Sequence, residues 1–385
     1  MGQIKLFLVL SLICVVYLSG CAPETETSQT ETGYDNSIGY GSSLSYDDSF
    51  SVGVIETTEQ ENKSVLTLYN ESLNRVGTLM FDLGSMGTFY DPPKIYKDSM
   101  YVIPKGLGNQ KNLKCVLQVD LRTGTGRQYN LGLAGMNSFE VNDHYIFGVN
   151  TLNFQSVIAR LDKTANVVKT ITLPGTYIER LILGDRNLFA FGIDKSNDGT
   201  VTSDLYEIDA TTLSILRKHA IGSYGISHHG ALFVNGKLFF TNATKADGIR
   251  NESPTNVLTV YDPADAGFET IQLDAFFPAQ ILRFENKLLV THCNLVTGEG
   301  KNISIYNLDT GETKLVSLDH NVSQISIHRD SLFMTDGVSL YHYKIAGTDL
   351  TYIQMKEVRT LKTQAKHYYI GALFSNMSSP DMTLR

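Results

Sequence analysis

The chain has 385 residues, a formal net charge of −8 at pH 7 and a hydrophobic content of 42%. This content is enough for a large buried core. The negative charge, with no basic cluster in the sequence, excludes nucleic acid as an expected partner.

The first twenty residues are typical of a secretory signal. Lys5 precedes an apolar run from Leu6 to Leu18, which has the length of a signal core and is short for a spanning helix. The run ends in Leu18, Ser19, Gly20 and Cys21, which resemble the lipobox of bacterial lipoproteins. That resemblance implies a signal peptide over 1–20, lipidation of Cys21 and an extracytoplasmic place on the cell membrane or outer membrane. An ordinary cleaved signal is the alternative.

Residues 21–48 are rich in Ser, Thr, Gly and acidic side chains. Such a composition has too little apolar surface to fold by itself, so we predict a flexible polar tether. The tether leads to a folded domain over residues 49–377, and residues 378–385 form a C-terminal tail.

A strand-turn-strand pattern recurs seven times in this domain. Each copy has an apolar strand that ends in Asp or Asn, a Thr/Gly turn and a second alternating strand. Asp and Asn suit the turn because their side chains accept hydrogen bonds from amides two residues on. The residues that open the turns are Asn70, Asp120, Asp162, Asp209, Asp262 and Asp309, with a degenerate copy near Ala346.

A second hairpin precedes six of these copies, and two hairpins per repeat make a four-stranded sheet, the blade of a β-propeller. One strand over 49–57 and one over 367–375 are left over at the two ends of the domain. Pairing them would complete a further blade and cover open sheet edges. We therefore predict an all-β, seven-bladed β-propeller whose last blade is closed by the N- and C-terminal strands.

The repeats "YEIDATTLSI" and "IYNLDTGETKLV" resemble those of YVTN or YncE-like propellers, a WD40-like group. The resemblance covers the rhythm of most of residues 50–376 and implies an extracytoplasmic propeller, but no common chemistry. The absence of Trp removes the signatures of true WD repeats, quinoprotein dehydrogenases and sialidase Asp-boxes. Cys115 and Cys293 lie far apart in the repeat scheme, so we expect two buried free thiols.

Ligands of propellers usually meet the face built by the loops between second and third strands and between blades. On that face, polar pairs end the second strand of three consecutive blades, and two of the loops between blades carry histidines. The sequence therefore predicts a sector of this face that recognises a ligand. The alternative is a rim that is polar without binding anything. The residues of the predicted sector are Tyr224, His228, His229, Asn242, His292, His320 and Asp336.

Two further groups are candidates for chemistry. Asp194, Ser196 and Asp198 alternate like the start of a calcium loop, although an ordinary tight turn fits the same residues. Glu140 and Arg283 occupy similar positions in apolar innermost strands and are candidates for a general acid and an anion clamp in the channel. Charges that only face a wet channel are the alternative.

Taken together, the sequence predicts a monomeric, lipid-anchored propeller that binds a protein, glycan or small molecule without catalysis and needs no cofactor, unless calcium binds. The alternative is a lactonase-like hydrolase with its site at the channel mouth. An enzyme requires titratable groups with shifted pKa values that converge in a pocket, and a binding module does not.

Overall fold

The computed structural model describes residues 50–58, 63–81, 83–87, 91–105, 113–195, 201–246, 252–358 and 368–376. All regular elements within these ranges are strands. No helix in the described ranges is long and apolar enough to cross a membrane. The predicted signal peptide, Cys21, the tether and the C-terminal tail lie outside them.

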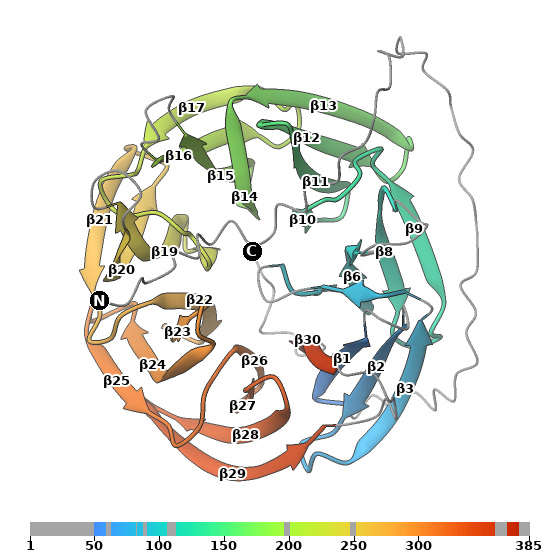
Figure 1. Ribbon diagram of the computed structural model, residues 1–385, viewed down its shortest axis with the longest axis vertical. Helices are drawn as coiled ribbons and strands as arrows, with labels where there is room; N and C mark the ends of the chain where they lie inside the picture. Colours follow the sequence, from blue (N-terminus) through green and yellow to red (C-terminus); the bar gives the residue numbers. More distant parts are fainter. Residues whose placement is uncertain are drawn as a thin grey trace, which may run out of the picture.

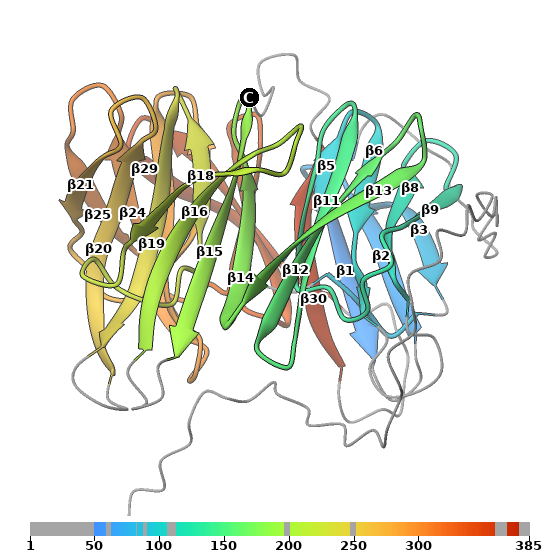
Figure 2. The same cartoon turned by 90° about the horizontal axis from the view of Figure 1, so that it is seen from above.

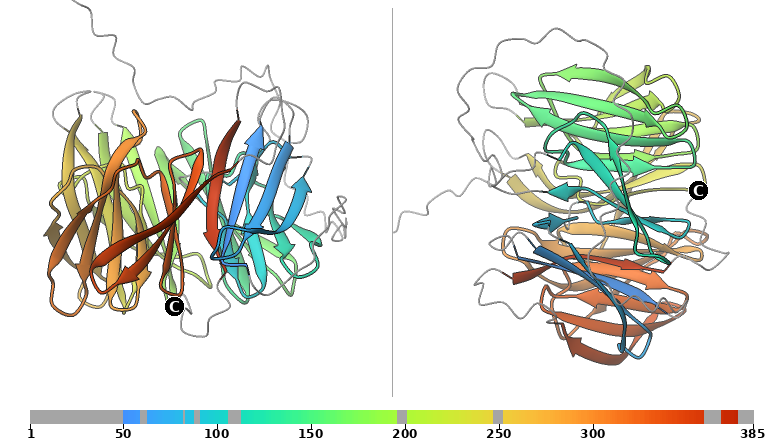
Figure 3. Two further views of the ribbon diagram at one scale, coloured as in Figure 1. Left: turned by 90° about the horizontal axis from the view of Figure 1, so that it is seen from below. Right: turned by 90° about the vertical axis from the view of Figure 1, so that its right-hand side faces the viewer.

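The strands form seven four-stranded antiparallel sheets arranged in a ring (Figure 1). The first strand of each blade lies nearest the centre and the last strand lies outside, and the blades stand side by side around the axis (Figures 2 and 3). The predicted seven-bladed β-propeller is confirmed.

We number the blades in chain order. Blade 1 holds β5 (Lys94–Tyr96), β6 (Ser99–Val102), β8 (Cys115–Asp120) and β9 (Gly126–Asn130). Blade 2 holds β10 (Ser138–Val141), β11 (Tyr145–Leu152), β12 (Gln155–Asp162) and β13 (Val167–Pro174). Blade 3 holds β14 (Thr176–Leu183), β15 (Asn187–Lys195), β16 (Val201–Asp209) and β17 (Ile215–Ala220). Blade 4 holds β18 (Ala231–Val234), β19 (Lys237–Ala246), β20 (Glu252–Asp262) and β21 (Gly267–Gln272).

Blade 5 holds β22 (Pro278–Phe284), β23 (Lys287–Asn294), β24 (Glu299–Asn307) and β25 (Thr313–Ser317). Blade 6 holds β26 (Gln324–His328), β27 (Ser331–Thr335), β28 (Ser339–Ala346) and β29 (Asp349–Glu357). Blade 7 holds β30 (Tyr368–Ser375), β1 (Val52–Thr58), β2 (Lys63–Tyr69) and β3 (Arg75–Phe81). A small pair, β4 (Ser85–Met86) with β7 (Pro104–Lys105), stands beside blades 7 and 1.

Blade 7 closes the ring in the predicted way, since the C-terminal β30 pairs antiparallel with the N-terminal β1. The red ribbon of β30 runs beside the blue one of β1 in Figure 3. Asn376 fastens the junction, because its backbone N–H donates to Ser51 O at 3.1 Å and its side-chain amide donates to Phe50 O at 2.9 Å. The closure therefore joins both ends of the described chain by sheet and side-chain hydrogen bonds.

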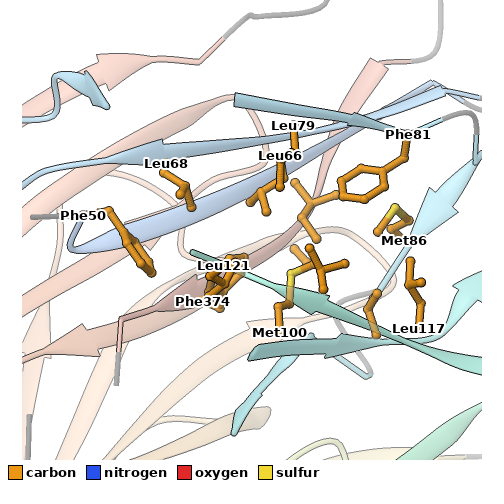
Figure 4. Packing of buried hydrophobic residues seen from close by; sticks show 14 residues of the cluster. Phe50, Leu66, Leu68, Leu79, Phe81, Met86, Met100, Leu117, Leu121 and Phe374 are labelled. Carbon is orange, nitrogen blue, oxygen red and sulfur yellow. The ribbon is translucent and has the colours of Figure 1, made fainter. Parts of the chain in front are cut away.

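The hydrophobic core lies between adjacent blades. In Figure 4, Phe50, Leu66 and Phe374 of blade 7 face Met100 and Leu117 of blade 1. All of them are buried. Each blade thus buries one face against the next, which is why the alternating strands need a closed ring.

One of the predicted turn positions is wrong. In blade 2, Asp162 Oδ1 accepts from the N–H groups of Thr164 and Ala165, as expected. In blade 5 it is Asn307, and not Asp309, that accepts from the residues two and three places on, Asp309 and Thr310. Both residues satisfy the local pattern, and only the strand pairing decides between them.

The two cysteines behave as predicted, since Cys115 and Cys293 are buried and free. Burial raises the pKa of Cys115 to about 12 and that of Cys293 to about 11. Both are therefore uncharged thiols that pack as small apolar side chains.

Candidate functional site

An open cleft of about 370 Å³ lies on the rim of blade 5, where the loop before β22 meets the turn between β23 and β24. Its volume is in the range of small-molecule sites. The cleft belongs to the face of inter-blade loops and second-to-third-strand turns on which the sequence analysis placed ligand recognition. The lining residues are Asp274, Ala275, Phe276, Phe277, His292, Asn294, Glu299, Gly300 and Asn302.

The backbone around the cleft is held by hydrogen bonds to two strands. Phe277 has a φ of 58°, and its N–H donates to Thr255 O at 2.9 Å while its carbonyl accepts from Cys293 N–H at 2.9 Å. This turn leaves the neighbouring Phe276 57% exposed. A Cβ on Gly300 would collide with the carbonyl oxygen of His292, so the close approach of β24 to β23 requires glycine.

His292 is buried beneath the cleft and holds one of its loops by a hydrogen bond. Its side chain is 3% exposed, and Nδ1 lies 3.0 Å from Phe276 O and Nε2 lies 2.7 Å from Ser304 Oγ. Because a carbonyl can only accept, Nδ1–H donates to Phe276 and Nε2 accepts from Ser304. Burial lowers the pKa of His292 to about 4, so a neutral ring fixes the Phe276 loop and has no nitrogen left to act as a base.

The polar side chains of the cleft keep bonding capacity for a ligand. Asn294 Oδ1 accepts from Val296 N–H at 3.0 Å, and Asn302 Oδ1 accepts from Ser317 Oγ–H at 2.8 Å. These bonds use the amide oxygens, so the two NH₂ groups are the remaining donors. Within the described ranges, the carboxylates of Asp274 and Glu299 form neither an ion pair nor a hydrogen bond.

Two of the predicted recognition residues, His320 and Asp336, contact the same tyrosine in blade 6. His320 stacks on Tyr341 with ring centroids 3.5 Å apart, and the Tyr341 hydroxyl donates to Asp336 Oδ2 at 2.9 Å. The loop that carries His320 also reaches the cleft, because Asn321 Oδ1 accepts from Gly300 N–H at 3.4 Å. The sector over blades 5 and 6 is therefore continuous.

His228 lies apart from this sector and is buried. It is 1% exposed, and its ring packs between Phe191 and Phe240 at centroid distances of 5.2 and 5.4 Å. Burial lowers its pKa to about 4. The sequence placed His228 and His292 in a recognition sector on the rim, but both imidazoles are buried, because inter-blade packing covers the strand ends that carry or contact them.

Asn242 and Tyr224 also serve the interior of blade 4. The Asn242 amide donates to Thr259 Oγ1 at 2.8 Å, and Tyr224 stacks on Phe268 at 5.3 Å. The structure does not bring either side chain to the cleft of blade 5.

His229 belongs to a charged cluster at the channel side of blades 2–4, which we call the channel cluster and which includes Glu140, Glu179 and Arg180. Burial lowers the pKa of His229 to about 3, and the charge of Arg180 adds to the effect. Burial raises the pKa of Glu179 to about 7, against the hydrogen bond that its Oε2 accepts from His228 N–H at 3.3 Å. Burial lowers the pKa of Arg180, while the carboxylates of Asp91, Glu179 and Glu140 oppose the shift.

Glu140 and Arg283 are not brought together. Glu140 Oε1 accepts from Lys94 Nζ at 2.5 Å, and burial raises its pKa although Lys94 opposes the shift. Arg283 is exposed, and its Nε donates to Glu285 O at 2.8 Å in its own hairpin. The hypothesis of a joint acid and anion clamp therefore has no geometric support.

The calcium prediction falls mostly outside the described residues. Ser196 and Asp198 are not among them, and Asp194 Oδ2 lies 3.4 Å from Lys218 Nζ, which also pairs with Asp204 at 2.8 Å. No group of three His, Cys, Asp or Glu side chains that could hold a metal occurs in the part of the chain that the structure describes.

Sequence reasoning missed most of the cleft. Phe276, Asn294, Glu299 and Asn302 were not singled out, and only His292 was. A signal for Phe276 existed, since "DAFFPA" places two phenylalanines in an inter-blade loop where polar residues are expected. The amides and the carboxylate carry no such signal.

Comparisons with known proteins add little beyond this geometry. No family model matches the chain, and no curated protein matches it. Among solved structures, the chain is similar to one described as "Crystal structure of cobalt-substituted Synechocystis ACO", with 12% identity, coverage of 79% of this chain and 86% of that chain, and a TM-score of 0.48.

Proposed function

We propose that the protein is a lipid-anchored, extracytoplasmic β-propeller of the YVTN or YncE-like type that binds a ligand without catalysis, in the cleft of blade 5. One observation carries the proposal. The cleft combines an exposed phenyl ring with amide and carboxylate groups that have bonding capacity to spare, and His292 beside them has both ring nitrogens engaged.

The strand order supports a proposed anchor on the face opposite the cleft. β1 is the second strand of its blade and begins at Val52, whereas the cleft lies at the end of the second strand of blade 5. A tether from Cys21 would therefore join the ring on the face away from the cleft, which leaves the cleft accessible.

Lipid anchoring is tested by mass spectrometry of the mature N-terminus. We expect an acylated Cys21, and Cys21→Ser should release the protein or leave it unprocessed. An unmodified wild-type protein that starts at another residue would contradict the anchor.

Ligand binding is tested by thermal shift with a mixed library of saccharides, amines, amino acids and organic acids. A ligand that binds only the folded state raises Tm, and the rise grows with the ratio of ligand concentration to Kd. We expect at least one class to raise the Tm of the wild type and of Phe154→Ala, and not that of Phe276→Ala. Phe154 is a matched control, because it is 68% exposed on the rim of blade 2.

A hydrolase is a second candidate because burial raises the pKa of Glu179 to about 7, and its carboxylate lies beside Arg180 and accepts from His228 N–H at 3.3 Å. A carboxylic acid with that pKa suits general acid-base catalysis. Hydrolysis of a lactone or ester library by the wild type, and its loss in Glu179→Gln, would support this candidate over simple binding.

A further inference from the structure

We infer that the cleft of blade 5 binds an uncharged saccharide. This inference rests on the proposed function and specifies its ligand. It follows from the kinds of hydrogen-bonding groups that line the cleft, from the exposed aromatic ring and from the way both are held in place.

The cleft offers donors and acceptors side by side. The donors are the NH₂ groups of Asn294 and Asn302, whose oxygens already accept bonds from Val296 and Ser317. The acceptors are the carboxylates of Asp274 and Glu299. A hydroxyl group donates and accepts at once, so a ligand with several hydroxyls satisfies both sets.

Charged small molecules match the cleft less well. An organic anion would meet two carboxylates, and the lining includes no Lys or Arg to balance them. An organic cation would pair with the carboxylates but would leave the two amide donors without acceptors, which weakens binding. A neutral polyhydroxyl ligand can bond to both the exposed carboxylates and the amide donors.

Phe276 supplies the apolar part of the site. Its ring is 57% exposed and lies beside the polar groups of the cleft. The flat, C–H-rich face of a pyranose ring can pack on such a ring, while its hydroxyls lie at the edge. Aromatic rings provide large contact area at low entropic cost.

The site is held in place before a ligand binds. The hydrogen bond of His292 to Phe276 O fixes the aromatic loop, and Gly300 lets β24 lie close to β23. The side chains thus come from three rigidly connected segments, which reduces the entropic cost of binding.

The absence of Trp from the chain permits a direct test. Phe276→Trp places the only indole of the protein at the cleft, and Phe154→Trp places it on the rim of blade 2 as a matched control. Each variant is titrated with a panel of neutral mono- to tetrasaccharides of glucose, galactose, mannose and N-acetylglucosamine, with putrescine and with citrate. Wild-type binding is measured in parallel by isothermal titration calorimetry.

We expect at least one saccharide to change the emission of Phe276→Trp and to leave Phe154→Trp unchanged. That saccharide should bind the wild type, and Asn302→Asp should weaken the affinity at least tenfold, because the change replaces a donor by an acceptor while keeping the oxygen that faces Ser317. Putrescine should gain affinity in the same variant.

The experiment distinguishes failure of the saccharide inference from failure of the proposed binding function. Binding of putrescine or citrate with no response to any saccharide would overturn the saccharide inference and leave the proposed binding function standing. No response to any probe, in the variants and in the wild type, would overturn both. Equal saccharide affinity in Asn302→Asp and the wild type would also overturn the inference.

Discussion

The channel cluster and the cleft on the rim of blade 5 both contain carboxylates and histidine, but they differ in what these groups bond to. In the channel cluster, Glu140 pairs with Lys94 and Glu179 accepts from the backbone of His228. In the cleft, His292 is bonded, but the carboxylates and amide donors around it have capacity left.

The difference distinguishes polar side chains that stabilise the fold from polar side chains that can bind a ligand. Polar side chains that bond to one another between blades stabilise the ring, whereas those left over beside an exposed aromatic ring are available to a ligand. Burial and charge do not distinguish the two histidines, since both His228 and His292 are buried and neutral. Only the groups that each ring contacts differ between the two regions.

The largest effect should come from His228→Ala, at about 3 kcal/mol of unfolding free energy, because the change leaves a cavity between Phe191 and Phe240. Urea unfolding measures the loss. The exposed His144 is the control, and His144→Ala should change stability by less than about 0.5 kcal/mol. Equal losses in the two variants would show that His228 is not a packing residue.

Glu140→Gln should cost about 2 kcal/mol, since it leaves the Lys94 ammonium in a half-buried place without its carboxylate. The exposed pair of Lys97 and Asp143 offers a control, because breaking it by Asp143→Asn should cost less than about 1 kcal/mol. Urea unfolding at neutral pH compares the two. A neutral result for Glu140→Gln would contradict a structural role of the channel cluster.

The pH dependence of stability should have opposite signs for His292 of the cleft and Glu179 of the channel cluster. The folded pKa of His292, about 4, lies below that of the unfolded chain, so its contribution is present above pH 6.5 and is lost as pH falls toward 4, at up to about 1.4 kcal/mol per unit. The raised pKa of Glu179, about 7, gives stability that is present below about pH 4.5 and is lost as pH rises through 7.

Unfolding between pH 4 and 7 tests these signs. His292→Gln should reduce the loss of stability on acidification, and Glu179→Gln should increase it. If both variants shift the profile in the same direction, the assigned environment of one of the two groups is wrong.

The smallest effect on stability should come from Phe276→Ala. Its ring is exposed, so the free energy of unfolding should change by less than about 0.5 kcal/mol, while ligand binding at the cleft is lost. Urea unfolding measures the change. A large loss of stability would show that Phe276 is a packing residue, and the contrast between exposed residues of the cleft and buried residues between blades would no longer hold.

Much of the fold could be predicted from the sequence because its determinants are local. Alternating apolar residues and short Asp or Asn turns define each hairpin within a few residues, and counting hairpins yields seven blades and the closure of β1 by β30. The one misplaced turn, at Asp309, shows the limit of local patterns, since Asn307 fits equally well until β24 is paired with β25.

The cleft was decided only by the tertiary structure. Asp274, Asn294 and Asn302 lie in separate segments, and their meeting depends on the pairing of β23 with β24 and on the close approach that Gly300 allows. Packing between blades likewise decided that His228 is buried and that Phe276 is exposed. Sequence periodicity specifies which residues alternate within a strand, but which polar groups find partners depends on contacts between segments far apart in the chain.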